Sequence, residues 1–213
     1  VMLIVGDVHG KVNQFLDIVA DYRSKSSELI IQLGDLGFQK QWDEVIQYCF
    51  DTNETNLRII PGNHDDYNRY SINFSNNEMQ WCRTEPLLVE DVWDEEYMNC
   101  FSVRGANSID KHLRKLGVDW FPEEELTYTQ LGKAVDDFIV SQPKYMFSHT
   151  CPSSVKKQLF NYDESSRTEQ ALQVMFELHQ PEIHFFGHFH RSVDKVINGT
   201  RFICLAELQT YEL

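Results

Sequence analysis

Short apolar runs alternate with amphipathic segments through the first 65 residues. "MLIVGD" at 2–7 predicts a short buried strand, and further buried strands are predicted over 28–35 and 56–65. Between these strands, apolar residues recur at helical spacing: Val12, Phe15, Leu16, Val19 and Tyr22 within 11–24, then Trp42, Val45, Ile46, Cys49 and Phe50. This β-α-β-α-β order predicts parallel strands joined by right-handed crossovers.

The second half of the chain repeats strand and helix patterns and ends in a hairpin. Buried strands are predicted over 100–106, 143–150 and 182–190, and helices over 129–141 and about 167–179. Two β-rich arms in 193–208 flank Asn198-Gly199, a pair that favours a tight hairpin turn. The acidic segment 66–100 has no clear periodicity, and we expect it to cover a sheet edge or shape a substrate groove. Together these patterns predict an α/β fold with helices outside and two mixed sheets inside.

Composition narrows the class of protein. The length of 213 residues and the hydrophobic fraction of 42% fit one domain, spanning 1–213, around one large core. A net charge of −14 argues against a general binder of nucleic acid or of membrane surfaces. The five cysteines are scattered and include no C-x-x-C pair, which favours a reducing compartment, and no apolar run approaches a membrane span. We therefore expect a soluble, cytoplasmic protein with no membrane partner.

Five Gly- or Ser-flanked motifs follow predicted strands. They are "GDVHG" (6–10), "GDLG" (34–37), "GNHDD" (62–66), "SHT" (148–150) and "GHFH" (187–190), and they hold five of the eight histidines. One such motif is usually only a turn, but five at the carboxyl ends of strands indicate a shared site. Their carboxylates, imidazoles and amide suit Mn²⁺, Fe or Zn²⁺, and the absence of thiolates disfavours a zinc–sulfur site. The pattern predicts two adjacent metal ions, as used for in-line attack at phosphorus.

As an ordered set, these motifs resemble those of the calcineurin-like metallophosphoesterase superfamily over almost the whole chain. The resemblance implies a four-layer α-β-β-α sandwich with two mixed β-sheets. It also implies two divalent ions, Mn²⁺ first, with Fe, Zn, Ni or Co as alternatives. By this resemblance Asp35 would bridge the ions and act in catalysis, and the other ligands would divide into two sets of three: Asp7, His9 and His190 for one ion, and Asn63, His149 and His188 for the other.

The resemblance also assigns His64 a catalytic role, as acid for the leaving group or as a phosphate ligand. In the protein Ser/Thr phosphatases of the superfamily, the second motif continues as Gly-Asp-x-Val-Asp-Arg-Gly. Here the corresponding text is "GDLGFQ", so the Asp that would orient His64 and the Arg that would grip phosphate are both missing. This departure argues against a protein phosphatase of that branch without affecting the predicted metal ligands.

The stretch 103–126 resembles a motif of compact stand-alone bacterial and phage metallophosphoesterases. That similarity places four residues near the phosphate or the leaving group: Arg104, Asn107, Asp110 and Arg114. The alternative is a strand end and surface loop, with Trp120 and Phe121 in a satellite core. We interpret the acidic run 123–125 as a helix start or solvated face. Arg69 is interpreted as a solvated surface residue, with a role as a further phosphate clamp as the alternative.

Three histidines outside the motifs are interpreted as structural or surface residues: His112, His179 and His184.

The function expected from the motifs and the resemblance is hydrolysis of phosphate esters by attack of a metal-bound hydroxide. Phosphatase and small-nucleotide phosphodiesterase activities both remain open, on a small molecule, a nucleotide or a phosphoprotein. The acidic charge disfavours a nuclease acting on long nucleic acid. A non-catalytic scaffold on the same fold is the alternative from another class, but such proteins normally lose ligands, and here all seven ligand positions and His64 are present.

Overall fold

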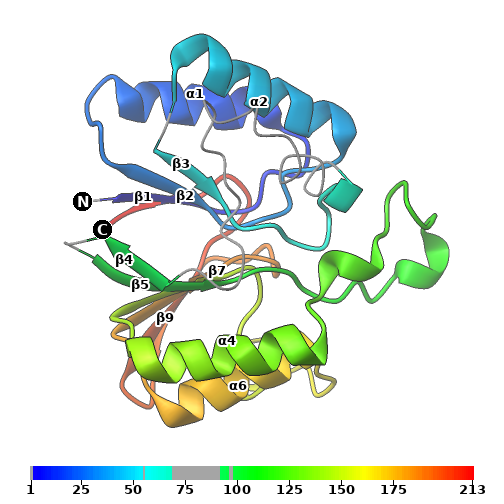
Figure 1. The fold of residues 1–213 in the computed structure, drawn as a ribbon, viewed down its shortest axis with the longest axis vertical. Coiled ribbons are helices and arrows are strands. Elements are labelled where there is room, and N and C mark those ends of the chain that lie inside the picture. The colour runs from blue at the N-terminus through cyan, green and yellow to red at the C-terminus, as the bar shows by residue number, and fades with distance from the viewer. Residues whose placement is uncertain (1, 55, 69–91, 96–97) are drawn as a thin grey trace.

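The computed structural model describes residues 2–54, 56–68, 92–95 and 98–213. Two sheets face each other in the middle of the molecule, with helices on both outer faces (Figure 1). This arrangement confirms the predicted α/β class with two mixed sheets between helices. None of the described helices is long and apolar enough to cross a membrane.

The smaller sheet has the strand order β10-β1-β2-β3. Its strands are β1 (Met2–Val5), β2 (Leu29–Gln32), β3 (Leu57–Ile59) and β10 (Thr210–Glu212). The first three are parallel, as predicted, and β10 pairs antiparallel with β1 at the edge. Helices α1 (Val12–Arg23) and α2 (Gln39–Thr52) connect the parallel strands and cover the outer face of this sheet (Figure 1).

The larger sheet has the strand order β4-β5-β6-β7-β9-β8. Its strands are β4 (Val92–Glu95), β5 (Met98–Val103), β6 (Tyr145–Ser148), β7 (Ile183–Phe186), β8 (Val193–Ile197) and β9 (Thr200–Cys204). Strands β5, β6, β7 and β9 run parallel, while β4 and β8 pair antiparallel at the two edges. The outer helices are α4 (Tyr128–Ser141), α5 (Ser153–Phe160) and α6 (Arg167–Leu178).

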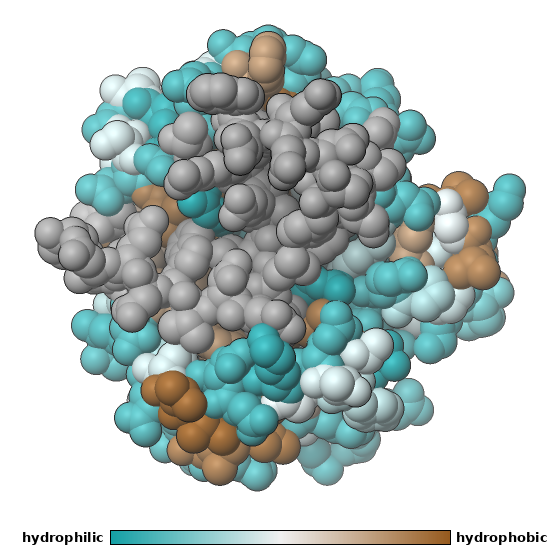
Figure 2. Space-filling model, viewed as in Figure 1, coloured by the Kyte–Doolittle hydropathy of each residue, from teal (hydrophilic) through white to brown (hydrophobic). Residues whose placement is uncertain are grey.

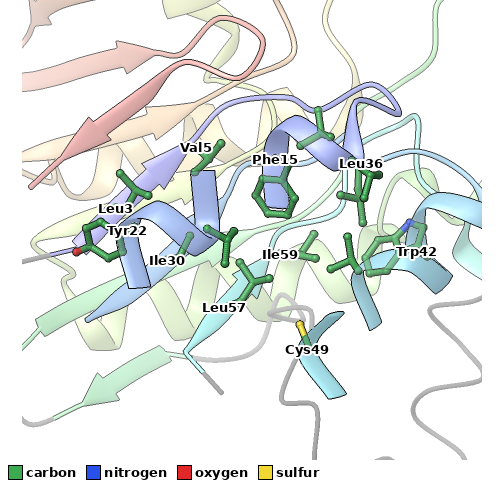
Figure 3. Close-up of a cluster of buried hydrophobic side chains, with 14 residues drawn as sticks. Leu3, Val5, Phe15, Tyr22, Ile30, Leu36, Trp42, Cys49, Leu57 and Ile59 are labelled. Carbon is green, nitrogen blue, oxygen red and sulfur yellow. The ribbon is translucent and has the colours of Figure 1, made fainter. Parts of the chain in front are cut away.

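Apolar side chains pack on both faces of the smaller sheet. Figure 3 shows the outer cluster, which includes Phe15 of α1, Trp42 of α2 and the strand residues Ile30, Leu57 and Ile59. The inner cluster joins the two sheets and includes Ile4, Ile31, Phe147, Phe185 and Ile203. Met146 of β6 and Phe186 of β7 belong to two further clusters with the helices of the larger sheet. Because β1, β2, β6 and β7 are thus packed on both faces, the loops that follow them start from rigid positions.

The predicted hairpin is confirmed, because β8 and β9 pair antiparallel on either side of Asn198-Gly199. Both turn residues have positive φ, 47° and 91°, as a tight hairpin turn requires. The second arm is shorter than predicted and ends at Cys204. Several predicted strands included the polar motifs, but the observed strands β2, β3 and β7 end before them. Those motifs form loops.

Some sequence predictions were wrong or incomplete. Phe50 was placed on the apolar face of its helix, but its side chain is 66% exposed, because it lies at the edge of that face. Helix α5 and the short edge strands β4 and β10 were not predicted. Within segment 66–100, β4 does cover an edge of the larger sheet, whereas residues 69–91, including Arg69 and Cys82, lie outside the described part of the chain. The other four cysteines are buried and free.

The connection from β5 to α4, residues 104–127, extends away from the body at the right of Figure 1. It contains two short 3₁₀ turns, η2 (Lys111–Leu113) and η3 (Pro122–Glu124). Figure 2 shows apolar side chains on this projecting segment, whose exposed members are Ile109, Leu113, Leu116 and Val118.

Candidate dinuclear metal site

The five sequence motifs meet at one edge of the sandwich. Asp7 follows β1, Asp35 follows β2 and Asn63 follows β3, while His149 and the pair His188 and His190 follow β6 and β7 of the other sheet. Parallel strands place their carboxyl ends together, and the two sheets pack with those ends on the same side. The structure therefore brings together all seven residues that the resemblance assigned as ligands.

Four of these side chains form one group, whose ligand atoms lie within 4.8 Å of one another: Asp7, His9, Asp35 and His190. The Nε2 atoms of His9 and His190 are 2.7 Å apart. The Asp7 Oδ2 atom lies 3.4 Å from His190 Nε2, and Asp35 Oδ2 lies 3.5 Å from His9 Nε2. Two ring nitrogens and two carboxylate oxygens directed at one point match the donor set of a divalent cation.

A second group adjoins the first and shares Asp35. It contains Asp35, His149 and His188, again with ligand atoms within 4.8 Å. His149 Nε2 lies 3.2 Å from Asp35 Oδ1 and 3.2 Å from Asn63 Oδ1. The Nδ1 atom of His149 donates to the Leu33 carbonyl at 2.7 Å, so its Nε2 is left to face these oxygens. The two oxygens of Asp35 thus face different groups, as a bridging carboxylate would.

Four of the seven residues have a backbone conformation that side chains rarely adopt. The φ angles of His9, Asp35, His188 and His190 lie between 47° and 68°. Each such residue costs about 1–3 kcal/mol, and such strain persists at sites where function requires it. Here the strain turns each side chain out of the strand direction and toward the common point.

Glycines in the motifs leave room for the ligands themselves. A Cβ at Gly62 would overlap Asp35 Oδ1 and would lie 2.6 Å from His149 Nε2. A Cβ at Gly187 would overlap Asp7 Oδ1, and one at Gly34 would overlap His149 Nδ1. The sequence pattern of glycines beside acids and histidines is therefore a packing requirement of the ligand cluster.

The electrostatics of the cluster favour a cation. Burial opposes protonation of His149, but Asp35 and Asp7 raise the pKa of His149 to about 10. Burial likewise disfavours the charged form of His9, yet the same two carboxylates raise its pKa. Burial and the neighbouring His149 lower the pKa of His188 to about 3, which leaves that ring neutral. The Oδ2 atom of Asp35 is buried and has no hydrogen-bond partner among the described residues. A positive ion would satisfy this oxygen, so the residues present fit a metal centre.

Asn63 is oriented by a relay that sequence reasoning missed. The Ser108 hydroxyl donates to Glu124 Oε2 at 2.6 Å, so its oxygen accepts from Asn63 Nδ2, which is 3.1 Å away. This fixes the amide nitrogen toward Ser108 and the carbonyl oxygen toward His149. The interpretation of run 123–125 as a solvated face was therefore wrong for Glu124, which is buried because η3 turns it inward onto Ser108. Ser108 and Glu124 both lie in the stretch 103–126, and the resemblance of that stretch to a known motif was the available signal.

Asp65, the acid beside His64, supports the site through the backbone. Its carboxylate accepts hydrogen bonds from the N–H groups of Asp35 at 2.9 Å, Gly62 at 2.6 Å and Gly37 at 3.2 Å. Burial and the nearby Asp35 charge raise the pKa of Asp65 to about 7. Asp65 therefore ties the loop after β2 to the loop after β3, rather than orienting His64.

His64 lies beside the cluster and is held by the projecting segment. The backbone N–H of His64 donates to Asp35 Oδ1 at 2.8 Å, and the centroid of the His64 ring is 5.2 Å from that of the His9 ring. Arg114 Nη2 lies 2.7 Å from His64 Nε2 and 2.9 Å from Asp110 Oδ1. Because a guanidinium only donates, Nε2 accepts and the ring proton is on Nδ1. Burial lowers the pKa of His64, Asp35 opposes this effect and Arg114 adds to it, so the ring is neutral near pH 7.

A cavity of about 800 Å³ opens onto these residues. Its wall includes Asn107, Asp110 and Arg114, three of the four residues expected near the substrate. The fourth, Arg104, is buried elsewhere: it donates to the Glu123 carbonyl at 2.7 Å and stacks on Tyr67. Much of the remaining wall comes from the segment that runs from α5 through the following loop to α6. The sequence analysis did not predict that this segment would line the cavity.

Comparison with known proteins decides the family. The family pattern Metallophos, described as calcineurin-like phosphoesterase, matches residues 1–192. The chain belongs to the calcineurin-like phosphoesterase family. This membership confirms the resemblance seen in the motifs, and a calcineurin-like phosphoesterase is a metal-dependent phosphoester hydrolase. The comparison with curated proteins gave no match.

Two solved structures share the calcineurin-like fold. The phosphopantetheinyl hydrolase of Mycobacterium tuberculosis matches with a TM-score of 0.54 and 17% identity, over 97% of this chain and 89% of that one. A dimetal phosphatase from Danio rerio matches with a TM-score of 0.55 and 15% identity, over 97% of this chain and 87% of that one. At such identities the likeness is one of fold, and it does not extend to the substrate.

Proposed function

We propose that the chain hydrolyses phosphate esters at a two-cation centre, as a phosphatase or as a phosphodiesterase of small nucleotides. Asp7, His9 and His190 would hold one cation, Asn63, His149 and His188 the other, and Asp35 both. The observation that carries this proposal is the shared position of Asp35, whose two carboxylate oxygens face the two ligand groups separately. When bound, the two ions supply positive charge for the phosphoryl oxygens and bring the pKa of water toward neutrality.

The residues around the ligands position the ester. Arg114 lines the cavity with a guanidinium that can donate to phosphoryl oxygens in a planar fork. Asp110 holds that guanidinium beside His64, so that His64 and Arg114 form one positioned unit. A neutral His64 with its proton on Nδ1 can donate a hydrogen bond toward the leaving-group oxygen. This contact supports the expected role of His64 at the leaving group, and it supplies an orienting partner where the protein Ser/Thr phosphatases use an aspartate.

Metal choice follows from the donor set. Five nitrogen or amide ligands and two carboxylates suit Mn²⁺, Fe²⁺, Zn²⁺, Ni²⁺ or Co²⁺, with Mn²⁺ proposed first. The net charge of −14 disfavours a long polyanion such as nucleic acid.

The test uses chelator-stripped protein reloaded with each of these ions. Ion content is measured per chain, and turnover is measured with an aryl phosphate and with a bis-aryl phosphate. We expect two ions per chain and turnover that depends on them. Protein that holds two ions and hydrolyses neither ester, nor any of a panel of nucleotides and phosphopeptides, would contradict the proposed activity. Exclusive turnover of the diester would remove the phosphatase form of it.

A further inference from the structure

Three aromatic rings form a ladder in the wall of the candidate active-site cavity. Phe160, at the end of α5, stacks on Phe189 with ring centroids 4.1 Å apart and an interplanar angle of 11°. The ring of Tyr162 also lies near that of Phe189, with centroids 6.5 Å apart and an interplanar angle of 23°. Exposure increases along the row: Phe160 is buried in a core cluster, Phe189 is half-buried and Tyr162 is 55% exposed. The ladder is therefore anchored in the core at one end and open at the other.

The ladder adjoins the candidate metal ligands. Phe189 lies between His188 and His190 in the sequence, and its ring centroid is 5.0 Å from that of His188. Phe160, Tyr162 and Phe189 line the same cavity as both histidines. Tyr162 is thus separated from the ligand cluster by two ring-to-ring steps, of 5.0 Å and 6.5 Å. A group stacked on Tyr162 would therefore lie in the same cavity as the candidate ligands.

The cavity is larger than a phosphoryl group needs and offers apolar surface that the core does not use. Its volume of about 800 Å³ is in the range of cavities that enclose whole small-molecule ligands. Ile109, from the projecting segment, is 85% exposed and lines this cavity together with Tyr162. Two separate segments therefore present exposed apolar side chains to the same cavity.

We propose that Tyr162 and Phe189 form a stacking subsite for the nucleobase of a nucleotide substrate. The inference rests on the proposed phosphoesterase function and narrows its substrate class. Base–aromatic stacking needs an exposed, rigid ring, which the anchored ladder provides. Glu164 lines the cavity near Tyr162 and can accept hydrogen bonds from N–H groups of a base, whereas the Asp163 carboxylate is paired with Lys157 at 2.7 Å.

The first experiment compares a nucleoside monophosphate with glycerol phosphate, using protein loaded with Mn²⁺. Tyr162→Ala is expected to lower the ratio of kcat/KM for the nucleotide to that for glycerol phosphate by about tenfold, mainly through KM, because one stacked ring is lost. Tyr162→Phe should restore the ratio, because it keeps the ring. Tyr128→Ala is the matched control, since Tyr128 is 74% exposed on α4 and does not line the cavity. An unchanged ratio in Tyr162→Ala would overturn the proposal, as would a preference for phosphotyrosine over every nucleotide.

The second experiment separates this inference from the proposed activity. Calorimetric titration of chelator-stripped protein with a nucleoside needs neither cations nor turnover, because the probe carries no phosphate. Binding that weakens about tenfold in Tyr162→Ala and is retained in Tyr162→Phe supports the subsite even if no ester is hydrolysed. A nucleoside that does not bind the wild-type protein at millimolar concentration would overturn it, whatever the esterase assays show.

Discussion

The side-chain nitrogen of Asn63 lies 3.1 Å from the hydroxyl oxygen of Ser108, and that hydroxyl donates to the buried carboxylate of Glu124. Only one side of the candidate dinuclear site depends on this relay, because Asn63 belongs to the group with His149 and His188. We expect Ser108→Ala to weaken binding of one ion by about 10–100-fold and to leave the other unchanged. Stoichiometric metal titration distinguishes the two ions. Ser102→Ala is the control, since Ser102 is equally buried but its Oγ has no hydrogen-bond partner among the described residues. Two ions of unaltered affinity in Ser108→Ala would show that the relay does not orient Asn63.

Asp35 is predicted to be the residue that both ions require. Asp35→Asn removes the negative charge between the two ligand groups but keeps a side chain that tolerates positive φ, so the loop after β2 should keep its shape. We expect the protein to remain folded, to lose both ions on dialysis and to lose activity with them. Asp17→Asn, on the exposed face of α1, should keep both. Elemental analysis that finds one ion per chain in Asp35→Asn would contradict a bridging role.

His64 is predicted to act on the substrate rather than on the metals. Its side chain contacts Arg114 and lines the cavity, and His64→Asn leaves every proposed ligand in place. We expect kcat to fall about 10²–10⁴-fold with two ions still bound, and the loss to be greater for alkyl than for aryl phosphates, because an alkoxide needs more help to leave. His112→Asn, exposed on the projecting segment, is the control. Undiminished hydrolysis of an alkyl phosphate by His64→Asn would remove the acid role.

The fold and the ligand set could be predicted because both follow from local patterns that the structure repeats. Each short apolar strand with a polar motif after it can be recognised from the sequence by itself, and the parallel topology brings the motifs together. The burial of Glu124 could not be predicted from a local pattern. It depends on the path of the projecting segment, which returns η3 to Ser108, and a run of three glutamates otherwise looks like a solvated face.

Substrate-facing residues were the least predictable part of the site. Arg104 and Arg114 are ten residues apart in the same motif, yet Arg114 reaches His64 while Arg104 packs on Tyr67 and the Glu123 carbonyl. The Phe160–Phe189–Tyr162 ladder joins the end of α5 to the loop after β7, and such a contact between distant segments leaves no periodicity in the sequence. Whether the assigned ligands bind metal stays a prediction.

Two glycines should respond in opposite ways to the same substitution. Gly62→Ala would place a Cβ onto Asp35 Oδ1 and against His149, so we expect loss of both ions and of activity. Gly132 lies in α4 with open space around it, and Gly132→Ala should raise the free energy of unfolding by about 0.5–1 kcal/mol with the metal content unchanged. Urea denaturation and metal analysis of the two variants provide the comparison. A Gly62→Ala protein with two ions per chain would show that the ligands still bind metal when the loop at residue 62 is moved away from Asp35 and His149.

His184 should make the protein sensitive to mild acid independently of the metals. It is buried in β7 and bonded to the Ser148 hydroxyl, and burial lowers its pKa to about 3, against 6.5 in the unfolded chain. The unfolded state therefore binds a proton below pH 6.5 that the folded state does not, so stability is full above pH 6.5 and is lost as the pH falls toward 3. At pH 5.5 the loss from this residue alone should be about 1.4 kcal/mol. Urea denaturation of chelator-stripped protein at pH 7.5 and 5.5 measures how much the free energy of unfolding falls between the two pH values. We expect this fall to be smaller in His184→Gln than in wild type by that amount. Equal differences in the two proteins would mean that His184 is protonated without unfolding.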